Sequence, residues 1–126
     1  MVKTFTMVLG VVLLLVGILG FVLTPNDGLI LGVFAANTTH HVIHLASGIL
    51  GIAAATMGWS RTFCQIFGPV YLLVGVLGLV MVGNDGMLLG MVHVNMADHF
   101  LHFAIGGAAT YFGFLAPAGA TVGARI

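Results

Sequence analysis

Six histidines are the residues of this chain whose type and spacing could do chemistry. His41 and His44 are three positions apart, and His99 and His102 repeat that spacing 58 residues later. Imidazole nitrogens bind Zn, Cu, Fe and Ni, and they also hold the iron of haem. One interpretation is therefore a transition-metal, haem or chlorophyll-type cofactor with these four histidines as its candidate ligands.

Three further polar residues accompany these four histidines. His40 and Asp98 stand one position before His41 and His99, so each joins the helix face of the pair that follows it. We expect Asp98 to orient an imidazole from the second shell of such a site. His40 and His93 are weaker candidates for direct ligands.

Two other interpretations of the histidines stay open. They could be interfacial residues that hydrogen-bond to one another, to Asp98 and to loop carbonyls, since polar groups between membrane helices contribute roughly 0.6–2 kcal/mol each. They could also form a proton path, which the sequence disfavours because the inner half of each expected span has no ionisable residue. Copper would suit the nearby methionines, which are Met81, Met87, Met91 and Met96.

The histidine pairs are duplicated because the whole chain repeats itself. Between residues 10–48 and 68–106, 19 of 39 positions are identical without a gap. The duplicated residues include three glycines, an Asn-Asp-Gly turn, an asparagine and both histidines of each pair. This pattern predicts one domain, 1–126, built from two repeats at about 5–58 and 66–116.

The composition excludes several classes of protein. Hydrophobic residues make up 60% of the chain and charged residues 5%, far below the roughly 25% of a soluble domain. We therefore expect an integral membrane protein whose first partner is the lipid bilayer. A net charge of zero gives no basis for nucleic-acid binding. No His-Glu-x-x-His motif, nucleophile elbow or phosphate loop is present, so we expect no enzymatic activity.

Four stretches are long and apolar enough to be spanning helices, which need about 20 residues. They are Phe5–Leu23, Asn37–Met57, Ile66–Val82 and Asn95–Leu115. The expected fold is thus an all-α polytopic membrane protein, with four transmembrane helices in two tandem α-hairpin repeats of the same topology. Asn37 and Asn95 are typical N-caps. Each segment between paired helices opens with Asn-Asp-Gly, where we expect the glycine to take a positive φ and the rest to lie at the interface.

Charge distribution predicts the orientation of these spans. Lys3, Arg61 and Arg125 fall on one side of a four-span chain, and all three aspartates fall on the other. The positive-inside rule then places both termini in the cytoplasm and the histidines on the outer side.

Small residues continue down the histidine-bearing faces of the second and fourth spans. Such residues let membrane helices approach closely, so we expect these two spans to form the inner pair of the bundle. The residues are Gly48, Gly51, Ala55, Gly106, Ala109 and Gly113.

Several motifs resemble one family of small bacterial four-helix membrane proteins, catalogued as domain of unknown function 4383. They are Asn37-x-x-x-His41-x-x-His44, Tyr71-Leu72-Leu73-x-Gly75-x-Leu77-Gly78 and Asn95-x-x-Asp98-x-x-x-His102. The likeness covers nearly the whole chain. It implies a bacterial inner membrane, or another energy-transducing membrane, and a four-span bundle, but no activity or cofactor.

Two functions remain as expectations. The small size and scarcity of charge favour a non-catalytic accessory, assembly or scaffolding subunit that packs against a larger membrane complex or against itself. The alternative is a metal- or tetrapyrrole-binding redox or pigment protein that uses the outer-side histidines.

Overall fold

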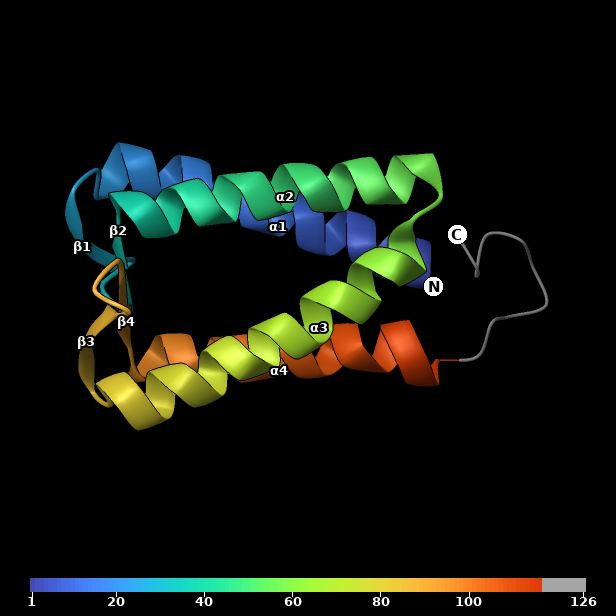
Figure 1. Ribbon diagram of the computed structural model, residues 1–126. Helices are drawn as coiled ribbons and strands as arrows, with labels where there is room; N and C mark the ends of the chain where they lie inside the picture. The colour runs from blue at the N-terminus through green and yellow to red at the C-terminus, as the bar shows by residue number, and fades with distance from the viewer. Residues whose placement is uncertain (117–126) are drawn as a thin grey trace.

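Two helix pairs joined by a short link make up the chain in the computed structural model, which describes residues 1–116. Figure 1 shows α1 beside α2 and α3 beside α4, with the two connecting segments at the same end. The helices are α1 (Val2–Leu23), α2 (Thr38–Met57), α3 (Ser60–Leu77) and α4 (Met96–Thr110). Two π-helical turns extend α3 and α4, namely η1 (Gly78–Val82) and η2 (Tyr111–Leu115).

The expectation of a purely α-helical chain needs one correction, because both connecting segments form β-hairpins. Strands β1 (Asp27–Ile30) and β2 (Phe34–Asn37) pair antiparallel in the first half of the chain. Strands β3 (Asp85–Leu88) and β4 (Val92–Asn95) do the same in the second half. Each hairpin pairs the backbone groups of a segment that is too short to span the membrane as a helix.

The chain reverses at a Leu-Gly pair in each hairpin. Leu31 and Gly32 have φ values of 55° and 72°, as the two central residues of a type I′ turn require, and Leu89 and Gly90 repeat this geometry. The positive φ expected at the Asn-Asp-Gly glycines was therefore wrong. Those glycines lie inside β1 and β3, because the strand register places the reversal three residues further on.

Helices within each pair touch backbone to backbone at glycines. A Cβ atom on Gly48 of α2 would lie 2.5 Å from the Leu14 nitrogen of α1. At the position 58 residues later, a Cβ on Gly106 of α4 would lie 2.7 Å from the Leu72 nitrogen of α3. Because only a hydrogen occupies these positions, the two helices of a pair can approach as closely as small residues allow.

The expected inner pair of second and fourth spans was wrong. The glycines of this set, on α2, α4 and η2, face α1 and α3, the helices that precede them in the chain. Gly51 lies against Gly10 of α1, and Gly113 lies against Cys64 and Gln65 of α3. A helical pattern identifies the face that packs but not the helix it packs against. Helices joined by a short β-hairpin usually lie next to each other.

Other sequence expectations about the helices agree with the structure. Asn37 and Asn95 are the N-caps of α2 and α4, and their side chains accept the backbone N–H groups of His40 and Asp98. Among residues 1–116, three helices are long and apolar enough to cross a membrane: α1, α2 and the continuous helix Ser60–Val82. This agrees with the membrane protein expected from composition.

Adjacent glycines on α4 give a matched test of the close contact. Gly106→Ala should lower the free energy of unfolding by about 1–3 kcal/mol, because its Cβ would meet the α3 backbone. Gly107→Ala should be neutral or stabilising by about 0.5–1 kcal/mol, since nothing lies within 4 Å of its Cβ. Unfolding in mixed micelles measures both, and equal effects of the two variants would contradict the contact.

Candidate functional site

His41 and His99 each hold the end of the preceding helix. The Nε2 atom of His41 donates to the carbonyl oxygen of Thr24, the C-cap of α1, at 2.6 Å. His99 Nε2 donates in the same way to the oxygen of Gly83, the C-cap of η1, at 2.7 Å. Carbonyls at a helix end have no partner within the helix, so each imidazole satisfies one of these groups.

Two glycines make room for these capping rings. A Cβ on Gly78 would lie 2.5 Å from Nδ1 of His99, and Gly20 stands in the same relation to His41. Both rings are buried, and within residues 1–116 their Nδ1 atoms have no hydrogen-bond partner. The Nδ1 side of each ring therefore faces helix backbone.

Three other histidines meet between the two helix pairs. The ring of His40 lies 4.4 Å from that of His44 and 6.1 Å from that of His102, centroid to centroid. Tyr71 of α3 packs its ring edge-on against His102 at 5.4 Å. These residues and Ser47 line a cavity of about 290 Å³ between α2, α3, α4 and the β3–β4 hairpin. We call it the imidazole cavity.

The three rings differ in their hydrogen bonding. His40 donates from Nδ1 to the His93 carbonyl oxygen at 2.9 Å, so a neutral His40 keeps its lone pair on Nε2. His44 and His102 are 7% and 5% exposed, and neither makes a hydrogen bond to any residue that the structure describes. Buried polar groups are nearly always paired in folded proteins, so these two rings are among the exceptions in the described chain, with the hydroxyls of Ser60 and Thr110.

The structure thus divides the four predicted ligands. It brings His44 and His102 to one cavity and places His41 and His99 at helix ends. Residues 1–116 contain no group of three or more His, Cys, Asp or Glu side chains placed to hold a metal ion. Metal or tetrapyrrole binding by the four together stays a prediction.

Asp98 closes the N-terminus of α4. Its carboxylate accepts the Asn95 N–H at 3.0 Å, while the Asn95 side chain accepts the Asp98 N–H, which completes a capping box. The carboxylate, 2% exposed, is therefore engaged with backbone. The role expected for it, orienting an imidazole, stays a prediction.

His93 links the two β-hairpins. Its Nδ1 contacts the carboxylate of Asp27 in β1, and its Nε2 contacts that of Asp85 in β3 at 2.5 Å. Both ring nitrogens donate, because ionised carboxylates only accept, so the ring is an imidazolium. Burial lowers the pKa of His93, but the hydrogen bonds and charges of Asp85 and Asp27 raise it more, to above the ordinary 6.5.

A reciprocal pair of amide contacts reinforces the junction between the hairpins. The Asn37 side chain donates to the Met91 carbonyl at 3.0 Å, and that of Asn95 donates to the Val33 carbonyl at 2.9 Å. Each asparagine is thus both a helix cap and a cross-link to the other half of the chain.

Comparison with known proteins identifies the family. The family model described as domain of unknown function 4383 matches residues 3–115. The chain belongs to this family. The resemblance seen in the sequence is therefore confirmed. No curated protein and no solved structure matches the chain.

In this member of the domain of unknown function 4383 family, Tyr71, Ser47, Asp27 and Asp85 were not among the predicted site residues. Departure from the repeat was the available signal for the first two. The residues 58 positions from Tyr71 and Ser47 are Leu13 and Ile105, both apolar. The two aspartates are instead duplicated, and no sequence pattern indicates that one histidine contacts both.

The His93 link makes stability depend on pH. A group whose pKa is raised by folding stabilises the protein fully below its unfolded pKa, and this contribution is lost as pH rises through its folded pKa. Wild type should therefore exceed His93→Gln in unfolding free energy near pH 6, by about 1 kcal/mol or less because Asp27 and Asp85 are well exposed. The difference should shrink above neutral pH in thermal-unfolding series, whereas a gap that widens with pH would contradict the link.

Proposed function

We propose that the chain crosses the membrane four times, as two tandem repeats of one topology. Helix α4 and η2 run for twenty residues from Met96 to Leu115, a helical length of about 30 Å. Contacts in the two halves support the repeat, since the glycine contacts and the histidine caps recur 58 positions apart. At the end opposite the hairpins, Oγ1 of Thr6 lies 3.3 Å from Sγ of Cys64, the residue 58 positions later.

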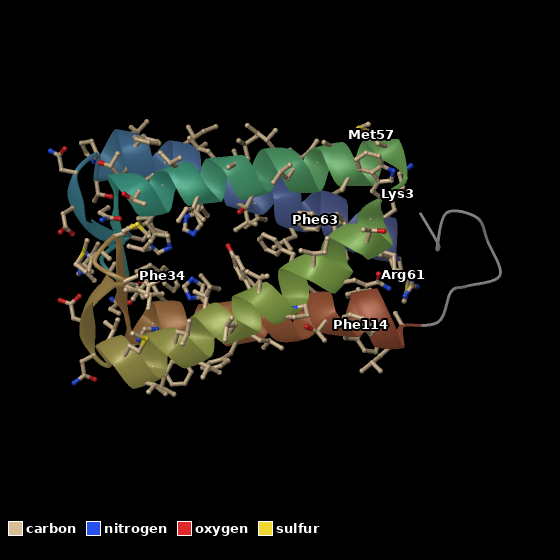
Figure 2. The ribbon with its side chains drawn as sticks, viewed as in Figure 1. Lys3, Phe34, Met57, Arg61, Phe63 and Phe114 are labelled. Atoms are coloured by element: carbon tan, nitrogen blue, oxygen red, sulfur yellow. The ribbon has the colours of Figure 1, made fainter. Side chains whose placement is uncertain are left out.

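The hairpins and histidines belong, in this proposal, to the outer side of the membrane. Figure 2 shows Lys3 and Arg61 at one end of the molecule and Phe34, in β2, at the other. Arg61 donates to the carbonyls of Phe112 and Gly113, so the end of η2 lies beside a cationic residue. By the positive-inside rule this end is cytoplasmic. Arg125, which carries the same expectation, lies outside the described residues.

The proposed function is that of a non-catalytic accessory, assembly or scaffolding subunit of a larger complex in a bacterial inner membrane or another energy-transducing membrane. One observation carries it: the buried polar groups mostly hold the chain together, while its exposed surface is largely apolar. Exposed apolar residues occur on all four helices, for example Leu15, Leu50, Leu73 and Phe100. They also occupy both hairpin tips, where Leu31 is 74% and Leu89 63% exposed. A surface of this kind suits contacts with other membrane helices or with itself.

Gentle purification from native membranes tests this role. The chain should arrive with a larger membrane protein at a constant ratio, or as a defined homo-oligomer. Leu31→Ser with Leu89→Ser should reduce that recovery if the tips contribute to the interface, whereas Thr56→Ser, an exposed residue at the other end, should not. A wild-type chain that is always recovered as a monomer would contradict the proposal.

A cofactor protein is the second candidate, favoured by the imidazole cavity. His44 and His102 are the predicted ligands whose rings remain without partners in the described chain. Absorbance spectra and metal analysis of the same preparation separate the candidates. A haem or chlorophyll band, or about one metal per chain, would support a cofactor protein and displace the accessory role.

A further inference from the structure

Two of the rings that line the imidazole cavity, those of His44 and His102, make no hydrogen bond to a described residue. His41 and His99 show the local pattern, in which Nδ1 is buried without a partner and Nε2 donates to a carbonyl oxygen. In His44 and His102 the Nδ1 atom is likewise buried without a partner. By this pattern Nε2 is the nitrogen left to donate, and no described carbonyl accepts from it, so an acceptor on a ligand in the cavity could pair with each ring.

The other polar groups of the cavity define that ligand more closely. Tyr71, which is 6% exposed, contributes a phenolic O–H to the lining. Neither Lys nor Arg is among the lining residues, so no permanently charged cation there would balance a carboxylate or phosphate. A neutral head with carbonyl oxygens therefore fits the donors better than an anionic lipid head. The volume, about 290 Å³, suits a small ring system at the lower end of ligand pockets.

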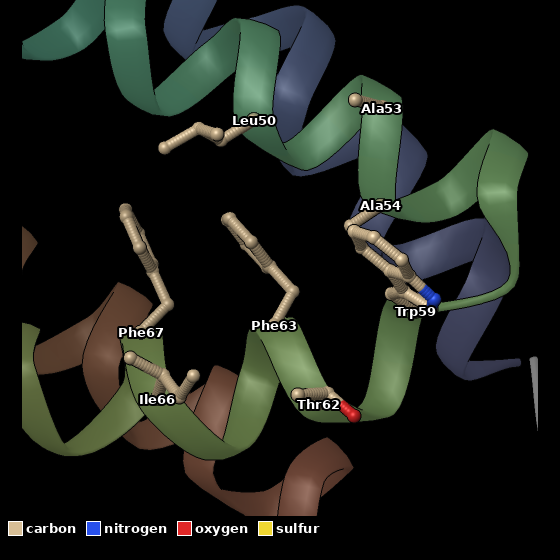
Figure 3. Close-up of a pocket in the computed structure, with 8 residues that line it drawn as sticks. All are labelled: Leu50, Ala53, Ala54, Trp59, Thr62, Phe63, Ile66 and Phe67. Carbon is tan, nitrogen blue, oxygen red and sulfur yellow. The ribbon is translucent and has the colours of Figure 1, made fainter.

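A second, apolar pocket also lies between α2 and α3. It measures about 280 Å³ and lies between the later turns of α2 and the first turns of α3. Figure 3 shows Phe63 and Phe67 extending from α3 toward Leu50 of α2, with Trp59 against Ala54. Phe67 lines both cavities, so the two lie next to each other at this ring.

The rim of the apolar pocket is open to the surroundings of the helices. Leu50 and Ile66, which line it, are 62% and 64% exposed. In a bilayer these side chains would meet lipid tails, and a hydrocarbon chain could enter from the side. This pocket suits a tail, as the imidazole cavity suits a head.

We propose that the two cavities together form a binding site for a membrane quinone. The two carbonyl oxygens of the ring accept from the imidazoles of His44 and His102, with the Tyr71 hydroxyl as a further donor. The hydrocarbon tail lies along the apolar pocket beside Phe63. This is a binding site, with no electron transfer assigned to it, and it holds whether or not the chain is part of a larger complex.

Divergence between the repeats supports a site on this side of the molecule. Tyr71 and Ser47 line the imidazole cavity, whereas Leu13 and Ile105 occupy the positions related to them by the 58-residue shift. His40 is similarly paired with Asp98, which is engaged in its capping box. The positions that the repeat relates to the cavity lining therefore do not carry the same set of donors.

The full chain in lipid nanodiscs, titrated with a decyl-substituted benzoquinone, tests the site. Trp59 is the only tryptophan and lines the tail pocket, so quinone binding should quench its fluorescence saturably. Decylbenzene, which has the tail without the carbonyls, and decanoate, which has a carboxylate, are the matched probes. Decylbenzene should bind at least about tenfold more weakly than the quinone, because it lacks both acceptor oxygens. Decanoate should also bind at least about tenfold more weakly, because its charge would be buried with no Lys or Arg beside it.

Variants assign the binding to named side chains. His44→Leu with His102→Leu should weaken quinone binding at least about tenfold without lowering the Tm, because apolar groups replace unpartnered polar ones. Tyr71→Phe should weaken it several-fold, whereas Tyr111→Phe, the only other tyrosine and an exposed one, should not. If the double variant does not fold, the comparison of Tyr71→Phe with Tyr111→Phe tests the site. Equal binding of decylbenzene, tighter binding of decanoate, or wild-type affinity in Tyr71→Phe and the histidine variant would overturn the proposal.

Discussion

Backbone carbonyls at the ends of membrane helices need donors where lipid offers none, and His41 and His99 meet that need here. Each ring donates from Nε2 to the carbonyl that ends the preceding helix. Gly20 and Gly78 allow each ring to lie against that helix. The same carbonyl begins the turn into a β-hairpin, so this hydrogen bond satisfies the helix end at the point where the chain turns toward the strands. Further along each pair, the glycine contacts let the two helices approach closely.

The two kinds of histidine show how a duplication can keep structure and change chemistry. His41 and His99 are equivalent and do the same structural work in both halves. His44 and His102 are also equivalent, but their surroundings differ because Tyr71 and Ser47 have apolar counterparts. The polar lining of the imidazole cavity is therefore a property of the assembled pair of repeats, and one repeat alone could not form it.

Much of the fold could be predicted from the sequence, for identifiable reasons. Long apolar stretches gave the helices, and Asn37 and Asn95 gave the starts of α2 and α4. The β-hairpins were missed because their Leu-Gly turns carry a leucine at positive φ, where Asn or Asp is usual. The partner of each glycine face was missed because periodicity along one helix says nothing of its neighbour. The His93 link joins residues 66 positions apart and depends on how the hairpins pack, which no local pattern encodes.

The most direct measurement of the central claim, four crossings with both hairpins outside, is labelling of single introduced cysteines in intact cells. The native Cys64 is fully buried, so it should not react with a membrane-impermeant maleimide. Leu89→Cys, at a hairpin tip, and Leu115→Cys, at the end of η2, replace well-exposed residues on opposite ends of α4. The account predicts that Leu89→Cys reacts from outside and that Leu115→Cys reacts only after permeabilisation. Reaction of both from outside would show that α4 does not cross, and would contradict the account.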